Sequence, residues 1–296
     1  MDAAASKIAL VTGATSGIGI WTALGLARQG YTVAITARDR TKGEATRSWL
    51  AERAPAAKIE LLMAEMASLD DVRRLAADVK ARYGRLDLLV NNAGLIRDRR
   101  ELTVDGFERI FAVNHLAPFL LTLELLDLLK ASAPARIINV GSEASDNAVL
   151  ELDNLQSERR FGMMNAYGQS KLGIMLFTFE LARRLEGTGV TANVVHPGVV
   201  ATNIFNLGGW KGGIVAVLGP LLRLFLLSPE QGASTTLHVA TAPELATVTG
   251  KYFKASKEVA PNPHGLDRDL AAALWEKSVT LTAAPAATEG EFSSPQ

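Results

Sequence analysis

Short apolar segments of strand length alternate with longer helical segments along almost the whole chain. The first three apolar segments are KIALVTG (7–13), YTVAITA (31–37) and KIELLMA (58–64), and helical stretches at 17–28 and 41–53 lie between them. Strands that read as apolar runs and are separated by helices form a parallel sheet that is covered on both faces. The alternation therefore predicts an α/β fold with a doubly wound, Rossmann-type sheet.

The same alternation continues toward the end of the chain. Further strands are expected at 86–94, 136–142, 190–198 and 250–253, and further helices at about 103–130, around Tyr167 to about Glu186, at 228–241 and at 266–281. This predicts about seven strands. No linker, repeat or break in composition divides the chain, so we expect a single domain over residues 1–282. The Pro-, Ala-, Ser- and Glu-rich stretch 283–296 is expected to be disordered.

The charge balance and the amino-acid composition exclude several classes of function. Lys plus Arg and Asp plus Glu are equal at 31 each, so no overall field attracts nucleic acid or an anionic membrane. The chain has no cysteine, which excludes disulfides, thiolate metal sites and a cysteine nucleophile. A reducing compartment is the natural expectation, and we predict a cytoplasmic location.

Neither a membrane span nor a metal site is expected from the sequence. The start, MDAAASKIALVTGA, resembles neither a signal peptide nor an anchor. No segment reaches the roughly 18 uninterrupted apolar residues that a membrane span needs. The four histidines form no pair with metal spacing. His115 and His196 are expected to be packed residues rather than ligands.

A glycine-rich segment, TGATSGIG (12–19), lies directly between the first strand and the first helix. Gly13, Gly17 and Gly19 permit a tight turn and a close approach of the backbone to a ligand. The free N–H groups and partial positive charge at the start of a helix favour a pyrophosphate. The spacing G-x-x-x-G-x-G differs from the standard G-x-G-x-x-G. Its position at the first strand–helix junction nevertheless predicts a nucleotide site.

The end of the second strand bears on the choice of cofactor. NAD-binding sheets usually place an acidic residue near this point, against the ribose 2′-hydroxyl. Here the strand ends at Ala37 and Arg38 follows, whose guanidinium can pair with a 2′-phosphate. We therefore expect NADP(H) to be favoured, and NAD(H) to be possible if Asp39 rather than Arg38 faces the ribose. The alternative is that Arg38 is a solvated loop cation.

A serine, a tyrosine and a lysine are candidates for the chemistry. Ser142 ends the fifth strand, at the carboxyl edge where open α/β sheets bind ligands. Tyr167 and Lys171 are four residues apart on the next helix and face the same way. An ammonium and a positive nicotinamide ring would lower the phenol pKa from about 10. Tyr167 could then exchange a proton with a substrate oxygen that Ser142 holds.

Taken together, the motifs resemble those of the short-chain dehydrogenase/reductase family from Lys7 to about Leu281. The shared segments are TGATSGIG (12–19), NNAG (91–94), VNHL with Asn114, NVGS with Ser142, YGQSK (167–171) and HPGVVAT (196–202). Within the family the chain is most similar to the retinol dehydrogenase-like branch, which includes the WW-domain oxidoreductases. The likeness lies in ITARDRTKGE (35–44), FAVNHLAPFLLT (111–122), SPEQGASTTLHVA (228–240), GKYF (250–253) and LWEKS (274–278).

The resemblance implies a catalytic tetrad of Asn114, Ser142, Tyr167 and Lys171, in which Asn114 helps to hold a proton-relay water. It implies that Glu65 stands where the family usually has an Asp that contacts the adenine. It also implies cofactor contacts from Gly13, Thr15, Ser16, Gly17, Ile18, Gly19, Arg38, Glu65, Asn91, Ala93, Gly94, Tyr167, Lys171, Pro197, Gly198, Val200 and Thr202. The branch tends to favour NADP(H) and apolar alcohols or ketones.

An apolar segment, NIFNLGGWKGGIVAVLGPLLRLFLL (203–227), lies where the family builds its substrate lid. Its apolar side chains would cover a hydrophobic substrate, and its glycines would allow it to move. The apolar residues are Phe205, Trp210, Ile214, Val217, Leu218, Leu221, Leu222 and Phe225. The alternatives are a core-packing helix, a dimer contact or a weak peripheral membrane patch.

Three functions remain open from the sequence. The first is an NADP(H)-dependent oxidoreductase that interconverts an apolar alcohol and its ketone or aldehyde. The second is a steroid- or polyketide-tailoring ketoreductase on the same scaffold. The third is a dinucleotide-binding scaffold or sensor without catalysis, against which the intact Ser142, Tyr167 and Lys171 argue. The expected partner is a small molecule, and the protein is expected to be a monomer or a homodimer.

Overall fold

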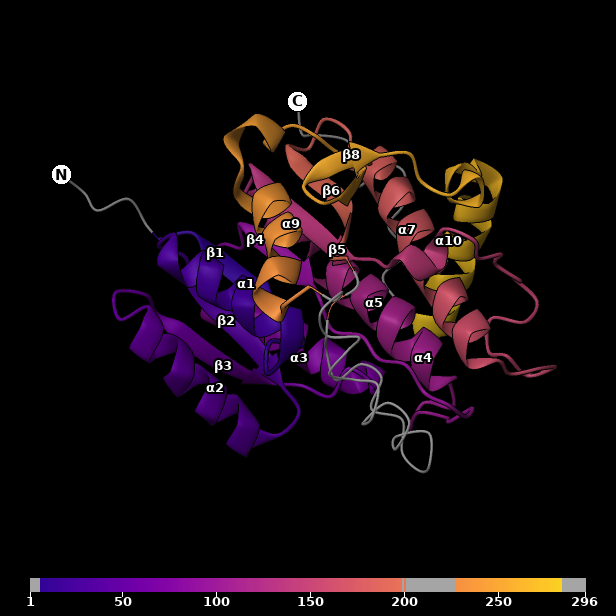
Figure 1. Ribbon diagram of the computed structural model, residues 1–296, viewed down its shortest axis with the longest axis horizontal. Coiled ribbons are helices and arrows are strands. Elements are labelled where there is room, and N and C mark those ends of the chain that lie inside the picture. The colour runs from indigo at the N-terminus through magenta and orange to yellow at the C-terminus, as the bar shows by residue number, and fades with distance from the viewer. Residues whose placement is uncertain (1–5, 199, 201–226, 284–296) are drawn as a thin grey trace.

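The strands form one sheet in the order β3-β2-β1-β4-β5-β6-β7-β8. The computed structural model describes residues 6–198, 200 and 227–283, and Figure 1 shows the strands crossing the middle of the molecule. They are β1 (Ile8–Val11), β2 (Thr32–Ala37), β3 (Ile59–Met63), β4 (Leu88–Asn91), β5 (Ala135–Val140), β6 (Val190–His196), β7 (Tyr252–Lys254) and β8 (Lys257–Val259). β1 to β7 pair in parallel, which confirms the predicted doubly wound sheet, and β8 adds an antiparallel edge strand.

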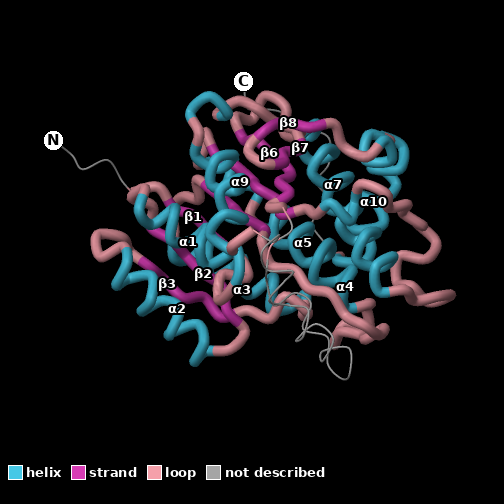
Figure 2. Tube along the Cα trace, in the orientation of Figure 1, coloured by secondary structure: helices cyan, strands magenta, loops and turns pink. Residues whose placement is uncertain are grey.

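Helices cover both faces of this sheet, as Figures 1 and 2 show. One face carries α1 (Gly17–Arg28), α2 (Arg40–Arg53) and α9 (Pro229–Thr241). The other face carries α3 (Leu69–Arg82), α5 (Ala117–Glu124) and α7 (Met163–Arg184). The helix α10 (Arg268–Thr282) packs on α7, and the short turns η4 (Pro243–Leu245) and η5 (Pro263–Leu266) precede β7 and α10.

The residues of β1 show why its sequence is apolar throughout. Ala9 and Val11 pack into the core beneath α1 and α9, whereas Leu10 packs into the core beneath α3, α5 and α7. All three side chains are fully buried. Successive side chains of a strand point to opposite faces, so a strand with helices on both sides is apolar at every position.

The long helix expected over 103–130 is divided in the structure. It begins only at α4 (Arg109–Phe111), continues through a π-helical turn, η1 (Ala112–Leu116), and α5, and ends as α6 (Leu126–Ala131). The expected start was wrong because Glu108 caps the helix, its carboxylate accepting hydrogen bonds from the main-chain N–H groups of Ile110 and Phe111. π-turns occur often at functional sites, and this one contains Asn114.

Several predicted features lie outside the described residues. They are Thr202, nearly all of the expected lid at 203–227, and residues 284–296 of the expected disordered tail. Beside this gap, Val200 forms a parallel bridge with Leu227. Over the part of the chain that the structure describes, no helix is both long enough and apolar enough to cross a bilayer.

Candidate active site

A cavity of about 1100 Å³ opens at the carboxyl ends of the strands, where the strand order reverses between β1 and β4. Open α/β sheets bind ligands at this point. The structure brings most of the predicted site residues to its wall. These are Gly13, Thr15, Ser16, Gly17, Ile18, Gly19, Arg38, Glu65, Ala93, Gly94, Ser142, Tyr167, Lys171, Pro197, Gly198 and Val200.

The glycine-rich loop is shaped for close backbone contact. Gly13 has a φ of +64°, and a Cβ atom on it would lie 2.8 Å from the Cα atom of Ala93. A Cβ atom on Gly19 would lie 2.5 Å from the carbonyl oxygen of Gly13. Ser16 stands at the N-cap of α1 but makes no side-chain cap bond. Ser16 therefore does not occupy the N–H groups in the first turn of α1, which lie at the cavity. These N–H groups could bind a pyrophosphate.

Two adjacent asparagines at the end of β4 have different roles. Asn92, which the sequence analysis did not single out, donates through Nδ2 to the carbonyl oxygens of Thr12 and Gly13, at 2.8 and 3.1 Å, and lies on the cavity wall. Asn91, the predicted cofactor contact, donates instead to Thr122 and Asn139 in the core. Asn91 is not among the cavity-lining residues of the described chain. Neighbouring strand residues face opposite ways. Asn91 therefore points into the core, and Asn92, the next residue, points to the cavity.

The part of the cavity next to the end of β2 is lined by two cations and two carboxylates. Asp39 Oδ1 accepts a 3.1 Å hydrogen bond from Lys42 N and thereby caps α2. The side chain of Arg38 is 62% exposed and lies 3.9 Å from Glu65 Oε2. Glu65 Oε1 accepts a hydrogen bond from Ala67 N at 3.0 Å. Lys42, a second cation that the sequence analysis missed, also lines the cavity.

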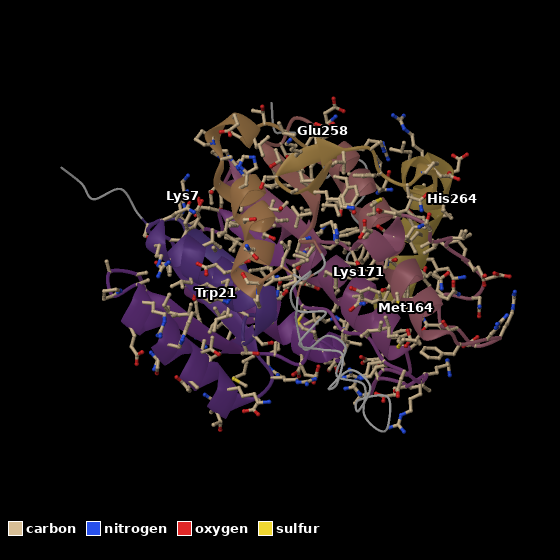
Figure 3. The ribbon with its side chains drawn as sticks, in the orientation of Figure 1. Lys7, Trp21, Met164, Lys171, Glu258 and His264 are labelled. Carbon is tan, nitrogen blue, oxygen red and sulfur yellow. The ribbon has the colours of Figure 1, made fainter. Side chains whose placement is uncertain are left out.

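Ser142, Tyr167 and Lys171 meet at the other end of the cavity. Ser142 starts the short 3-10 turn η2 (Glu143–Ser145), and its hydroxyl accepts from Ala144 N at 3.2 Å. The Ser142 side chain also acts on the Tyr167 hydroxyl, whose pKa it lowers. Lys171 is 4% exposed, and its Nζ donates to the carbonyl oxygen of Val140 at 2.8 Å. Figure 3 labels Lys171 near the middle of the view and Met164, which belongs to the same helix α7, close to it.

Burial has the largest effect on the pKa values in this group. Burial raises the pKa of Tyr167, and the Ser142 side chain acts in the opposite direction. Lys171 Nζ lies 5.8 Å from the centroid of the tyrosine ring, and burial lowers its pKa to about 8. In the protein by itself burial thus raises the pKa of Tyr167, and the expected lowering by Lys171 together with the positive nicotinamide ring stays a prediction.

Asn114 lies behind the cavity wall rather than on it. Its Oδ1 accepts a 2.8 Å hydrogen bond from Leu95 N, and its Nδ2 donates to Leu95 O and Ser170 Oγ. A Cβ atom on Gly94 would lie 3.4 Å from both Asn114 Oδ1 and Lys171 Nζ. Asn114 thus ties the π-turn to the loop after β4, next to Lys171. Its part in a proton relay stays a prediction.

Other wall residues were not found from the sequence. They include Met66, Leu95, Arg97, Val113, Glu143, Met164 and His196. Met164 could have been recognised because it lies three residues before Tyr167, on one face of the helix. His196 is 3% exposed, which confirms the expected packed histidine, but it also reaches the cavity.

Known proteins with similar sequences cover most of this chain. A family model described as short chain dehydrogenase matches residues 7–208. Retinol dehydrogenase 13 of Homo sapiens is 44% identical over 278 residues, which are 93% of this chain and 84% of that protein. Polyprenol dehydrogenase of Mus musculus is 38% identical over 94% of this chain and 84% of its own length.

Solved structures resemble the fold as well. An uncharacterized protein from Mycobacterium paratuberculosis matches with a TM-score of 0.77 and 32% identity over 94% of both chains. The RhlG/NADP active-site complex of Pseudomonas aeruginosa matches with a TM-score of 0.68 and 29% identity, over 85% of this chain and 95% of that one. The chain belongs to the short-chain dehydrogenase family, is similar to its retinol dehydrogenases, and is an oxidoreductase that uses a nicotinamide dinucleotide to interconvert alcohol and carbonyl groups.

Proposed function

We propose that the protein is an NADP(H)-dependent oxidoreductase that interconverts a hydrophobic primary or secondary alcohol and its aldehyde or ketone. One observation carries the proposal. Ser142, Tyr167 and Lys171 line the same cavity as the glycine loop and Arg38. A dinucleotide held along this cavity would bring its reactive ring toward the tyrosine.

Two cations favour NADP(H) over NAD(H). Arg38 and Lys42 both line the part of the cavity next to the end of β2, where the adenosine would lie. A 2′-phosphate there would be a strong acceptor of charge-assisted hydrogen bonds. The carboxylate of Asp39, which could have faced the ribose, accepts a hydrogen bond from Lys42 N. Glu65 opposes this preference because it already pairs with Arg38. Three solved relatives are also described with NADP or NADPH bound: RhlG, a blue fluorescent protein from a metagenomic library and the actinorhodin polyketide ketoreductase.

Tyr167 and Ser142 would handle the proton of the substrate oxygen. The bound cofactor supplies or accepts the hydride. In reduction, Ser142 would hold the carbonyl oxygen, and Tyr167 would donate its proton as that oxygen becomes an alkoxide. A buried phenol with a raised pKa is protonated at neutral pH, as a donor must be. With a pKa of about 8, Lys171 is mostly protonated at pH 7, and its charge would stabilise the phenolate left behind.

The described residues near Tyr167 favour an apolar substrate. Leu95 and Met164 line the cavity, and the Met164 side chain is half exposed. Two curated relatives are named for retinol and polyprenol, which are both apolar alcohols. A polyketide ketoreductase function is the second candidate, because the actinorhodin enzyme matches with a TM-score of 0.65 and 28% identity.

The test is NADPH consumption with a panel of carbonyl compounds matched in reactivity. The panel contains retinal, long-chain and short-chain aldehydes, aromatic ketones and a cyclic polyketide analogue. We expect kcat/KM to rise with the apolar length of the substrate. Turnover confined to the polyketide analogue would support the second candidate, and the absence of any turnover would contradict both. The cytoplasmic location and the monomeric or dimeric state stay predictions.

A further inference from the structure

His196 contacts the peptide unit that directly follows Ser142. It is the last residue of β6, and its side chain is buried at the wall of the cavity. Its Nδ1 accepts a hydrogen bond from the main-chain N–H of Glu143 at 3.2 Å. None of the roles described so far uses this side chain.

Both ends of that peptide unit are held. The carbonyl oxygen of Ser142 accepts hydrogen bonds from Ser145 N at 3.0 Å and from Ser145 Oγ at 2.7 Å. The N–H at the other end, that of Glu143, donates to His196. A peptide group is planar, so fixing its two ends fixes the ψ angle of Ser142, which is 151°. This angle sets how the turn leaves Ser142, whose hydroxyl accepts a hydrogen bond from Ala144 N and whose side chain acts on the Tyr167 hydroxyl.

The sheet register places His196 beside the turn. Val140 of β5 is the partner of Val195 on β6, so the residue after Val195 stands next to the segment that follows β5. On the other side, His196 is the partner of Lys254 on β7, and Lys254 forms an ion pair with the Glu143 carboxylate. The side chains of that ion pair are 39% and 48% exposed. Ion pairs as exposed as this one contribute little to stability.

The hydrogen bond to Glu143 determines which nitrogen of the ring carries the proton. A main-chain N–H can only donate, so Nδ1 is unprotonated and the proton of the neutral ring is on Nε2. Nε2 is buried and has no hydrogen-bond partner among the described residues; the carboxylate oxygen Glu143 Oε2 lies 3.9 Å away. Burial lowers the pKa of His196. The nearby charges of Lys254 and Lys171 lower it as well, whereas the carboxylates of Glu143 and Asp146 raise it. The ring therefore stays a neutral acceptor.

We propose that His196 is a positioning residue that, through its Nδ1 acceptor, keeps the Ser142 turn in the geometry that sets the serine hydroxyl against Tyr167. The inference rests on the proposed function, since it gives His196 a part in the same reaction. His196 touches neither the substrate nor the reacting atoms in this role. It acts through the main chain on Ser142.

Three variants separate this role from simple packing. His196→Phe keeps an aromatic ring but loses the acceptor, and we expect kcat to fall about 10- to 100-fold because a small misplacement of a reacting group is enough for such a loss. The dissociation constant of NADPH should change much less. His196→Asn offers Oδ1 at the position of Nδ1 and should restore most of kcat. Lys254→Met removes only the outer ion pair and should leave kcat within about threefold of wild type.

A double-mutant cycle with Ser142→Ala tests whether the histidine acts through the serine. In the Ser142→Ala background, His196→Phe should have little further effect, because groups that act as one unit are not additive. Losses that multiply would overturn the positioning role, as would a His196→Phe enzyme with wild-type kcat. A His196→Asn enzyme as impaired as His196→Phe would do the same.

A measurement without turnover separates failure of this inference from failure of the proposed function. In ¹⁵N-labelled wild-type protein, His196 Nδ1 should give the signal of an unprotonated acceptor, and the Glu143 amide should exchange slowly. A protonated Nδ1 or a fast-exchanging amide overturns the inference alone. If the Glu143 amide is protected but the wild-type protein turns over none of the carbonyl compounds, the proposed function is overturned. His196 then only stabilises the turn after Ser142.

Discussion

Lys171 reaches across from α7 to the end of β5, where its Nζ donates a 2.8 Å hydrogen bond to the main-chain carbonyl of Val140. Val140 is two residues before Ser142, so the lysine ties its own helix to the strand that carries the serine. The ammonium is buried at the cavity wall. This contact couples the positions of the three groups to which the proposed reaction assigns roles.

Replacing Tyr167 with phenylalanine should remove the proton donor and leave the cavity intact. We expect Tyr167→Phe to lower kcat by about 10²- to 10⁴-fold, the usual contribution of a general acid. NADPH binding, followed by the fluorescence of the cofactor, should stay close to wild type. Tyr31→Phe, at a half-buried tyrosine that does not line the cavity, is the matched control. Near-wild-type turnover by Tyr167→Phe would show that another group supplies the proton.

The protonation of Lys171 should appear in the pH dependence of cofactor binding. Its pKa is lowered to about 8 by burial, so the free protein loses this positive charge as the pH rises through about 8. We expect the NADPH affinity of the wild type to decrease over that range, because a dinucleotide is an anion. Titrations at fixed ionic strength would measure this. Lys171→Met should bind more weakly at neutral pH and lack this step; an unchanged step would assign it to another group.

The ion pair of Arg38 and Glu65 should tune the preference between NADPH and NADH. Arg38→Asp removes the partner of a 2′-phosphate, and we expect NADPH affinity to fall about 10- to 100-fold, the range for a lost charged hydrogen bond. Glu65→Gln releases Arg38 from its carboxylate and should favour NADPH by a few-fold. Dissociation constants of both cofactors give the ratio. Arg40→Ala, an exposed residue absent from the cavity wall, is the control. If both variants bind the cofactors like wild type, Arg38 is a solvated cation.

A buried histidine in the π-turn should make the protein sensitive to acid. His115 is fully buried, and its ring nitrogen Nε2 lies 2.8 Å from Ser278 Oγ. Ser278 Oγ also donates a hydrogen bond to Leu274 O, which favours the tautomer of His115 with its proton on Nε2. Burial lowers the pKa of His115 from 6.5 to about 3. As the pH falls below 6.5, the unfolded chain binds a proton that the folded protein does not.

The free energy of unfolding should therefore fall with decreasing pH between 6.5 and about 3. One such group contributes a slope of about 1.4 kcal/mol per pH unit, and about 5 kcal/mol over the whole interval. His115→Gln should remove this slope in urea titrations at several pH values. Ser278→Ala should lower stability at neutral pH and keep the slope. A His115→Gln protein with the wild-type pH dependence would assign the acid sensitivity to other groups.

Much of the fold could be predicted because its signals are local. The apolar runs at 7–13 and 31–37 became β1 and β2 with small shifts at their ends. The helix expected from Thr103 begins at Arg109 instead, because Glu108 caps it, and the main-chain N–H of Glu108 is itself held by Gln156, 48 residues further along the chain. The added strand β8 is three residues long and mostly exposed, so its sequence has no apolar pattern that would predict a strand.

The candidate site was predicted in part. The glycine loop, Ser142, Tyr167 and Lys171 line one cavity, as their motifs indicated. Asn92, rather than Asn91, reaches its wall, because the strand register decides which of two neighbouring side chains points inward.

Patterns among neighbouring residues were enough to identify the sheet, the nucleotide loop and the residues with suitable chemistry, because hydrophobic period and motif spacing can be read directly from the sequence. Only the tertiary structure decided which charged groups lie close enough to affect one another. The raised pKa of Tyr167, the pairing of Arg38 with Glu65 and the contact of His196 with Glu143 join segments far apart in the chain. Such distances exist only once the sheet has aligned its strands and buried the groups between them.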